Sequence, residues 1–178
     1  KDGNGIRLGP DGNPIQFDMI VDATRFPDWV NVLELVELYW AEVGIDMNID
    51  GISGELLDER RNANDYDATA NFSDGGLATL LNVGPFLMPM GSGSTFAPKW
   101  GAWYVPNPNF AGGPEEPPED VKQQQALYDQ VKATADPDEQ MELMSQIIDI
   151  AIDRFYCIGI SLDTGQFGVV KNNFHNVP

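Results

Sequence analysis

Alternating apolar and polar positions predict two strands separated by a helix in the first third of the chain. Over 16–21, Phe17, Met19 and Val21 occupy every second position, and over 45–50 the same period of two holds Ile45, Met47 and Ile49. Between them, 28–43 carries apolar residues at helical three- and four-residue spacing: Trp29, Val32, Leu33, Val36, Trp40 and Val43. Asp28 can cap the start of this helix and Gly44 its end. A strand, helix and strand in this order favour parallel strands joined by a right-handed crossover.

The middle of the chain changes from regular to irregular patterning. A short helix is predicted over 55–62, with Ser53 or Gly54 at its N-terminus, and a strand over 66–72. The following segment, 73–118, has no clear period and is rich in glycine and proline. A connection of this length inside a compact domain is usually functional or disordered, and its aromatic residues argue against disorder.

Two amphipathic helices dominate the last third. The first begins near Pro118, and its buried face is predicted from Val121, Gln124, Tyr128 and Val131. The second begins near Asp136, and its apolar stripe is predicted from Met141, Met144, Ile148, Ala151 and Phe155. Apolar segments over 156–162 and 167–170 are predicted to be extended, with a turn between them. The whole pattern predicts an α/β fold, a mixed sheet flanked by helices.

The charge balance narrows the range of partners. The chain has 178 residues, which suits one domain, and a net charge of −18. A surface this acidic repels phosphate backbones and anionic lipid, so nucleic acid and membrane-surface binding are excluded. The acids are dispersed along the chain, which favours an adaptation for solubility over a dedicated site for a cationic ligand. No stretch reaches the ~20 apolar residues of a membrane span.

Residues for catalysis are sparse. His175 is the only histidine, so neither a histidine-based triad nor a multi-histidine metal site can form within the chain. Glycine-rich phosphate loops and nucleophile motifs are also missing from the sequence, and one cysteine, Cys157, allows no internal disulfide. We therefore expect no enzyme activity, no metal and no cofactor. An enzyme would require a catalytic group that lies outside this chain.

Two groups of residues are candidates for binding. Asp74 follows the predicted strand over 66–72, and ligands of open α/β sheets lie beyond the carboxyl ends of strands; an Asp here can also simply cap a turn. Trp100, Trp103 and Tyr104 offer flat faces with polar edges, suited to sugar rings or peptide side chains. The alternative for these aromatic residues is that they anchor a long loop to the core.

The order of several short motifs resembles a known family, the family 5 extracellular solute-binding proteins, in its C-terminal lobe. Gly5-Ile6-Arg7 followed by Asp11-Gly12-Asn13-Pro14 resembles the segment by which the family's chain enters this lobe. Residues 40–45 of this chain resemble the family's helix-to-strand junction. Asp65-Tyr66-Asp67 with the following strand and Asp74 is similar to its ligand-side strand. The remaining likeness lies in 117–160 and 169–178. Because the sequence begins at Lys1 without Met, we expect a part of a longer receptor, with 1–178 as a single ligand-binding lobe.

The resemblance implies a receptor that captures a solute for an ABC importer. In this family the solute lies between two lobes that close on it, and the closed receptor meets a permease in the membrane. The resemblance implies a periplasmic or other extracytoplasmic location, free or anchored as a lipoprotein. For a peptide solute it implies that Asp74 binds an ammonium group and that the backbone of Ala70, Asn71 and Phe72 pairs with the peptide. Trp100 and Trp103 favour the alternative of an oligosaccharide receptor, and a domain used only for protein contacts is a further alternative.

The acidity generates a prediction about stability. With 28 acidic and 10 basic residues, repulsion among the acids should outweigh pairwise attraction, and salt screens that repulsion. We expect the melting temperature to rise between low and moderate NaCl concentration. A flat or falling melting temperature in the same scan would show that the acids are locally paired.

Overall fold

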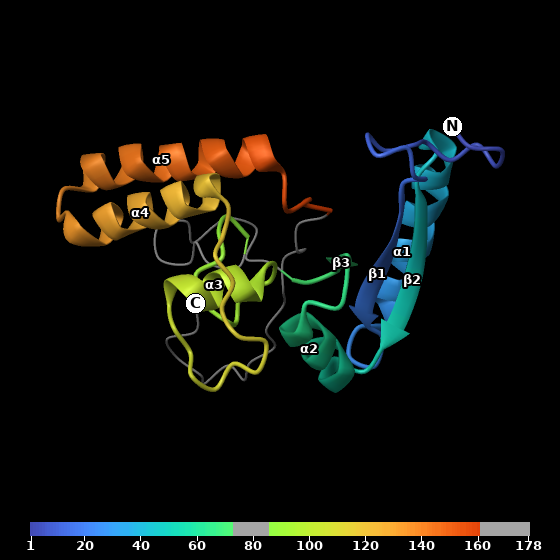
Figure 1. The fold of residues 1–178 in the computed structure, drawn as a ribbon, viewed down its shortest axis with the longest axis horizontal. Helices are drawn as coiled ribbons and strands as arrows, with labels where there is room; N and C mark the ends of the chain where they lie inside the picture. The colour runs from blue at the N-terminus through green and yellow to red at the C-terminus, as the bar shows by residue number, and fades with distance from the viewer. Residues whose placement is uncertain (73–85, 161–178) are drawn as a thin grey trace, which may run out of the picture.

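The computed structural model describes residues 1–72 and 86–160 (Figure 1). The predicted segment over 167–170, the turn before it, His175 and Asp74 lie outside the described residues. The α/β fold is confirmed. A small sheet with its helices occupies one side of the molecule, and a helical hairpin occupies the other (Figure 1).

Three parallel strands form the sheet. Strands β1 (Gln16–Asp22) and β2 (Asp46–Ile52) pair in parallel with Phe17 opposite Met47, and β3 (Ala68–Thr69) pairs with the other edge of β1. The strand order is β2-β1-β3. β3 is shorter than the predicted 66–72, because side chains take up neighbouring backbone donors. The Asp67 carboxylate accepts from the Asp18 N–H at 2.9 Å, and Asn71 Oδ1 accepts from the Phe72 N–H at 2.8 Å.

Helix α1 (Pro27–Val43) crosses from β1 to β2 and covers one face of the sheet. Its inward residue Leu33 is 2% exposed and packs with Met19, Val21 and Met47. The helix begins one residue earlier than predicted, with Pro27 in its first turn, so the predicted capping role of Asp28 is wrong. Proline suits the first helical position because its fixed φ is already helical and it has no N–H to satisfy. The predicted end is confirmed: Gly44 is left-handed, with a φ of 83°.

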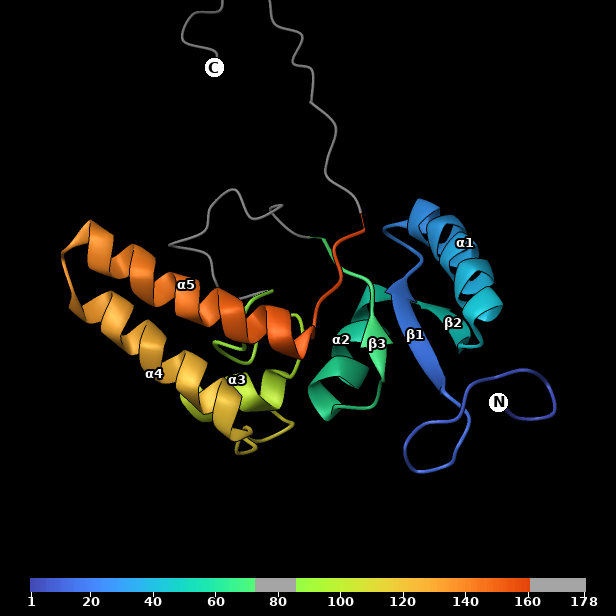
Figure 2. The same cartoon turned by 90° about the horizontal axis from the view of Figure 1, so that it is seen from above.

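Helix α2 (Gly54–Ala63) lies on the other side of the sheet (Figure 2). The predicted cap is confirmed, since Ser53 Oγ accepts from the Leu56 N–H at 3.3 Å. Near its end, Arg60 forms an ion pair with Asp50 of β2 at 2.6 Å, and this ties the helix to the sheet.

A second core lies between the two long helices and the loop before them. Helices α4 (Glu119–Ala133) and α5 (Pro137–Arg154) form an antiparallel hairpin (Figure 1). The predicted buried face of α4 is confirmed, but the predicted stripe of α5 is wrong: Met141 and Phe155 are 57% and 65% exposed, and Leu143 and Ile147 join Met144 in the core. The two helices and Met88 of the preceding loop form one buried cluster. From the helices it contains Leu127, Tyr128, Val131, Leu143, Met144 and Ile147. The sequence missed α3 (Pro98–Tyr104), because seven residues are too few to establish a helical period.

Two buried glutamines of α4 connect the helical hairpin to the loop over 86–95. Gln124, 1% exposed, donates from Nε2 to the backbone oxygens of Leu87 and Ile147, both at 3.0 Å. Gln125, 2% exposed, donates to the Pro89 oxygen at 3.2 Å. Buried carbonyl groups need such partners, so the two side-chain amides fix the course of the loop.

Replacing Gln124 with methionine tests this anchoring. Methionine has a similar shape but no donor, so the Leu87 carbonyl would be buried without its side-chain partner. We expect Gln124→Met to lower the free energy of unfolding by about 1–3 kcal/mol, measured by chemical denaturation. Gln130→Met is the matched control, because Gln130 is an exposed residue of the same helix. Equal losses in the two variants would contradict the anchoring role.

Candidate functional site

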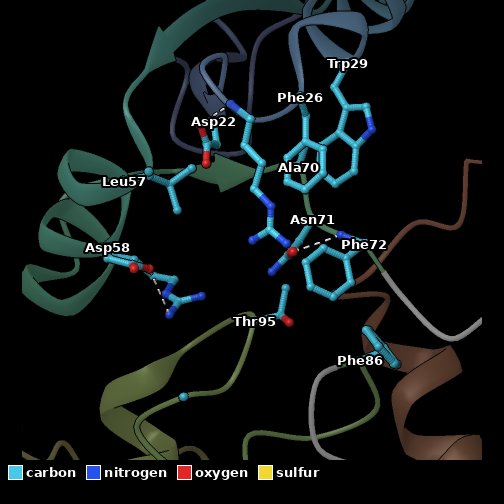
Figure 3. Close-up of a pocket in the computed structure, with 14 residues that line it drawn as sticks. Asp22, Phe26, Trp29, Leu57, Asp58, Ala70, Asn71, Phe72, Phe86 and Thr95 are labelled. Carbon is cyan, nitrogen blue, oxygen red and sulfur yellow. Dashed lines mark hydrogen bonds and ion pairs between the residues drawn. The ribbon is translucent and has the colours of Figure 1, made fainter.

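A cavity of about 560 Å³ lies where the carboxyl ends of the strands meet (Figure 3). Parallel strands end at the same edge of a sheet, and this edge is where open α/β folds hold ligands. The segments after all three strands contribute to the lining. Asp22 ends β1, and Arg25 and Phe26 follow it; Gly54 follows β2, and Ala70, Asn71 and Phe72 follow β3. The sheet topology therefore positions one whole wall of the pocket.

The loop after β1 is organised by a single carboxylate. Asp22 Oδ1 accepts from the Thr24 N–H at 3.1 Å, the Thr24 hydroxyl at 2.7 Å and the Arg25 N–H at 3.0 Å. The bond from the Thr24 hydroxyl, followed by that from the Arg25 N–H, holds the pKa of Asp22 below its usual value. The carboxylate thus fixes the turn from which the next two side chains, Arg25 and Phe26, reach the pocket.

An aromatic surface continues from this loop. The rings of Phe26 and Trp29 are stacked with centroids 4.0 Å apart, and the Phe72 ring lies tilted at 6.3 Å from that of Phe26 (Figure 3). The Arg25 guanidinium carbon lies 4.9 Å from the Phe26 centroid and 5.9 Å from that of Phe72. These distances allow cation–π attraction. Phe72 is 60% exposed, so its ring offers apolar surface for a ligand to cover.

Helix α2 and the loop over 86–95 complete the lining. From α2 come Leu57, Asp58 and Arg61, and from the loop come Phe86, Gly93 and Thr95. The loop is shaped partly by Ser94, whose buried hydroxyl accepts from the backbone N–H groups of Met90 and Gly91. Apolar rings, arginines, an amide and a hydroxyl make a surface that can hold an organic solute by both contact and hydrogen bonds.

The structure brings together some of the residues singled out from the sequence. Ala70, Asn71 and Phe72 line the pocket, whereas Asp74 lies outside the described residues. Their role in binding stays a prediction. Arg25, Phe26 and Arg61 were not singled out, although Arg25 and Phe26 directly follow the predicted strand over 16–21. The rule that pointed to Asp74, a position just past a strand end, applies equally to them.

The predicted aromatic group in α3 does not line this pocket. Trp100 packs edge-on against Tyr156 with centroids 6.0 Å apart, and Lys122 Nζ lies 5.9 Å from the Trp103 ring. Tyr104 donates to Asp129 Oδ1 at 2.5 Å, and burial followed by this bond raises the pKa of its phenol. Tyr104 thus holds α3 to α4, whereas Trp100 contacts the segment that follows α5. Binding by the three residues stays an untested prediction.

The described residues contain no cluster of three or more histidine, cysteine or acidic side chains arranged to hold a metal ion. Nor does any helix among them combine the length and apolar character that crossing a membrane requires.

No protein-family model and no curated protein matches the sequence. Solved structures do match. OppA, an oligopeptide-binding protein, is 30% identical with a TM-score of 0.59, over 84% of this chain and 25% of its own. MelB from Agrobacterium fabrum C58, a periplasmic binding protein in complex with stachyose, is 16% identical with a TM-score of 0.64, over 88% of this chain and 22% of its own. NikA from Brucella suis in complex with Fe(III)-EDTA is 16% identical with a TM-score of 0.54, over 85% of this chain and 28% of its own.

The matches show that this chain has the fold of part of a two-lobed periplasmic binding protein. The resemblance to family 5 solute-binding proteins, read from the sequence, is confirmed by these structures. OppA and MelB are described as binding proteins rather than enzymes. The chain spans only about a quarter of the length of the proteins that it matches, between 22% and 28%.

Gly54 provides a test of the packing that shapes the pocket. A Cβ at this position would lie 2.6 Å from Asp22 Oδ2, and Asp22 is held in place by its three hydrogen bonds. We expect Gly54→Ala to lower the free energy of unfolding by about 1 kcal/mol or more. Alanine is the better helix former, so a net loss would have to come from the clash.

Gly93→Ala is the matched control, because Gly93 lines the same pocket and has open space where a Cβ would stand. Thermal unfolding of both variants decides the point. If Gly54→Ala is as stable as the unchanged protein, Asp22 does not constrain the turn in the way the contacts indicate.

Proposed function

We propose that this chain is one ligand-binding lobe of a longer receptor that captures a peptide for an ABC importer. The observation that carries the proposal is the pocket itself, built from the segments that follow all three described strands. The 30% identity to an oligopeptide-binding protein supports the class of solute. The second lobe would close over this wall, and the closed receptor would deliver the solute to a permease outside the cytoplasm.

The position of β3 supports peptide binding in particular. Among the described strands, β3 has a neighbour on one side only, and its other edge is unpaired within 1–72 and 86–160. Ala70 donates to the Ile20 oxygen at 3.3 Å, which continues the pairing with β1 past the end of β3. An extended peptide can add to such an edge through main-chain hydrogen bonds, while the nearby pocket receives a side chain. Asp74, two residues after Phe72, remains the residue proposed to meet an ammonium group.

An oligosaccharide is the second candidate solute. The support for it is the structural likeness to MelB, which was solved with stachyose, together with the stacked rings of Phe26 and Trp29. Flat aromatic faces suit sugar rings as well as apolar side chains. Titration of the intact receptor with oligopeptides and with oligosaccharides, followed by calorimetry, separates the two candidates.

The Phe72 ring tests whether this pocket is where the solute binds. Truncating an exposed ring should leave folding nearly unchanged, but it removes apolar surface that a solute would bury. We expect Phe72→Ala to weaken solute binding by the intact receptor by roughly 1–2 kcal/mol, about five- to thirtyfold. Tyr39→Ala is the control, because Tyr39 is 63% exposed and does not line the pocket. Unchanged affinity in Phe72→Ala would place the solute elsewhere, and a receptor that binds neither class of solute would refute the proposed function.

A further inference from the structure

The outward side of α1 is apolar, although no other described helix or strand covers it. The helix packs on the sheet through residues such as Leu33 and Trp40, and its opposite side faces outward (Figure 2). Single exposed apolar residues are common, but a group of them on one side of a helix marks an interaction surface. The group, which we call the α1 face, has side chains between 43% and 63% exposed: Val32, Leu35, Leu38, Tyr39 and Val43.

The spacing within the α1 face suits a partner helix. Val32, Leu35 and Tyr39 are separated by three and then four positions, and Val43 follows after four more. Residues three and four apart lie one above the other on a helix, so these side chains form a stripe along its axis, with Leu38 beside it. A stripe of this kind packs against that of a second helix running alongside at a small angle.

The charges of α1 define the partner further. The helix contains four acidic residues and no basic residue, and the acids are all exposed: Asp28, Glu34, Glu37 and Glu42. No ion pair found within 1–72 and 86–160 includes any of them. Glu34 lies four positions before Leu38 and Glu42 four positions after it, so acidic side chains flank the apolar residues. The complement of this face is an apolar stripe flanked by lysine or arginine.

The same charges argue against two other occupants. A second copy of this chain would bring four acidic residues against four others, and like charges facing each other across an interface are unfavourable. A membrane surface with anionic lipid repels an acidic helix, whereas helices that lie in such surfaces carry lysine and arginine on their polar side. A basic protein segment is therefore the occupant that the charges favour.

We propose that the α1 face binds an amphipathic helix of a partner protein, in which basic residues flank an apolar stripe. The apolar side chains of the two helices would interdigitate, and lysine or arginine of the partner would pair with Glu34 and Glu42. None of the five residues of the α1 face lines the pocket, so the partner's site is separate from that of a solute. The inference concerns a different surface from the proposed function and does not depend on it.

A designed peptide stands for the partner helix in the test. The probe is an amphipathic peptide of about 18 residues, long enough to form a helix, with leucine in its stripe and lysine beside it. Its twin has glutamate in place of each lysine. Both peptides carry a fluorophore and are titrated with the full-length protein, with fluorescence anisotropy as the readout. We expect the lysine peptide to bind about tenfold more tightly or better, and the difference to shrink as added NaCl screens the charges.

Two double variants show whether the peptide binds to the α1 face. Leu35→Gln with Tyr39→Gln should weaken binding of the lysine peptide by about ten- to thirtyfold, because the partner loses apolar surface to cover. Glu34→Gln with Glu42→Gln should remove most of the preference for lysine over glutamate. Glutamine is a good helix former and all four side chains are exposed, so we expect α1 to stay folded.

Leu56→Gln with Met141→Gln is the matched control. Leu56 of α2 and Met141 of α5 are 43% and 57% exposed and lie outside the α1 face. The control should bind both peptides as the unchanged protein does. Melting temperatures of all variants report on folding, and if Leu35→Gln with Tyr39→Gln does not fold, the charge variant decides the question.

Several results would overturn the inference. Equal binding of the two peptides would show that the face attracts any apolar helix, and unchanged binding in both double variants would place the peptide elsewhere. If neither peptide binds, another part of the full-length protein covers α1. Dimers that Leu35→Gln with Tyr39→Gln dissociates, observed by sedimentation, would make a second copy the occupant. Solute binding is measured separately, and its absence would refute only the proposed function.

Discussion

The parallel pairing of β1 with β2 is the constraint on which the site depends. The crossover through α1 returns the chain to the end of the sheet at which β1 began, so β2 runs in the same direction as β1. The residues after the two strands therefore emerge side by side. The core beneath α1, built on Met19, Val21 and Leu33, fixes that crossover. A strand running the other way would have placed Asp22 and Gly54 at opposite ends of the sheet, and no common wall would exist.

The opposite wall follows from different physics. The loop over 86–95 has little regular structure, and its position depends on side chains that satisfy its backbone. Gln124 and Gln125 reach it from α4, and Ser94 closes its own turn. In addition, a Cβ on Gly101 would lie 2.1 Å from the Gly91 oxygen, so α3 approaches this loop backbone to backbone. The pocket is therefore shaped on one side by the sheet and on the other by buried amides.

The sequence predicted what depends on local pattern. The alternation at Phe17, Met19 and Val21 and the helical spacings predicted β1, β2, α1, α2, α4 and α5 nearly at their observed bounds, whereas β3 is shorter than predicted and α3 was missed. The Ser53 cap was visible from its position. What escaped prediction depends on contacts across the chain. Arg25 stands alone in the sequence, and only the fold shows that it lies over Phe72, 47 positions later, in a pocket that also contains Arg61. Likewise, the helical period placed Gln124 on the buried face of α4, but it could not show that its amide binds the backbone oxygens of Leu87 and Ile147.

The acidic surface and the arginines of the pocket act at different ranges. A net charge of −18 repels an anionic solute at a distance, but salt limits that field to roughly 8–10 Å. Within the pocket, where the Arg61 side chain is 16% exposed, short contacts are screened less than contacts on the open surface. The surface field therefore bears mainly on the rate of encounter with a charged solute, whereas contacts inside the pocket bear on the lifetime of a complex.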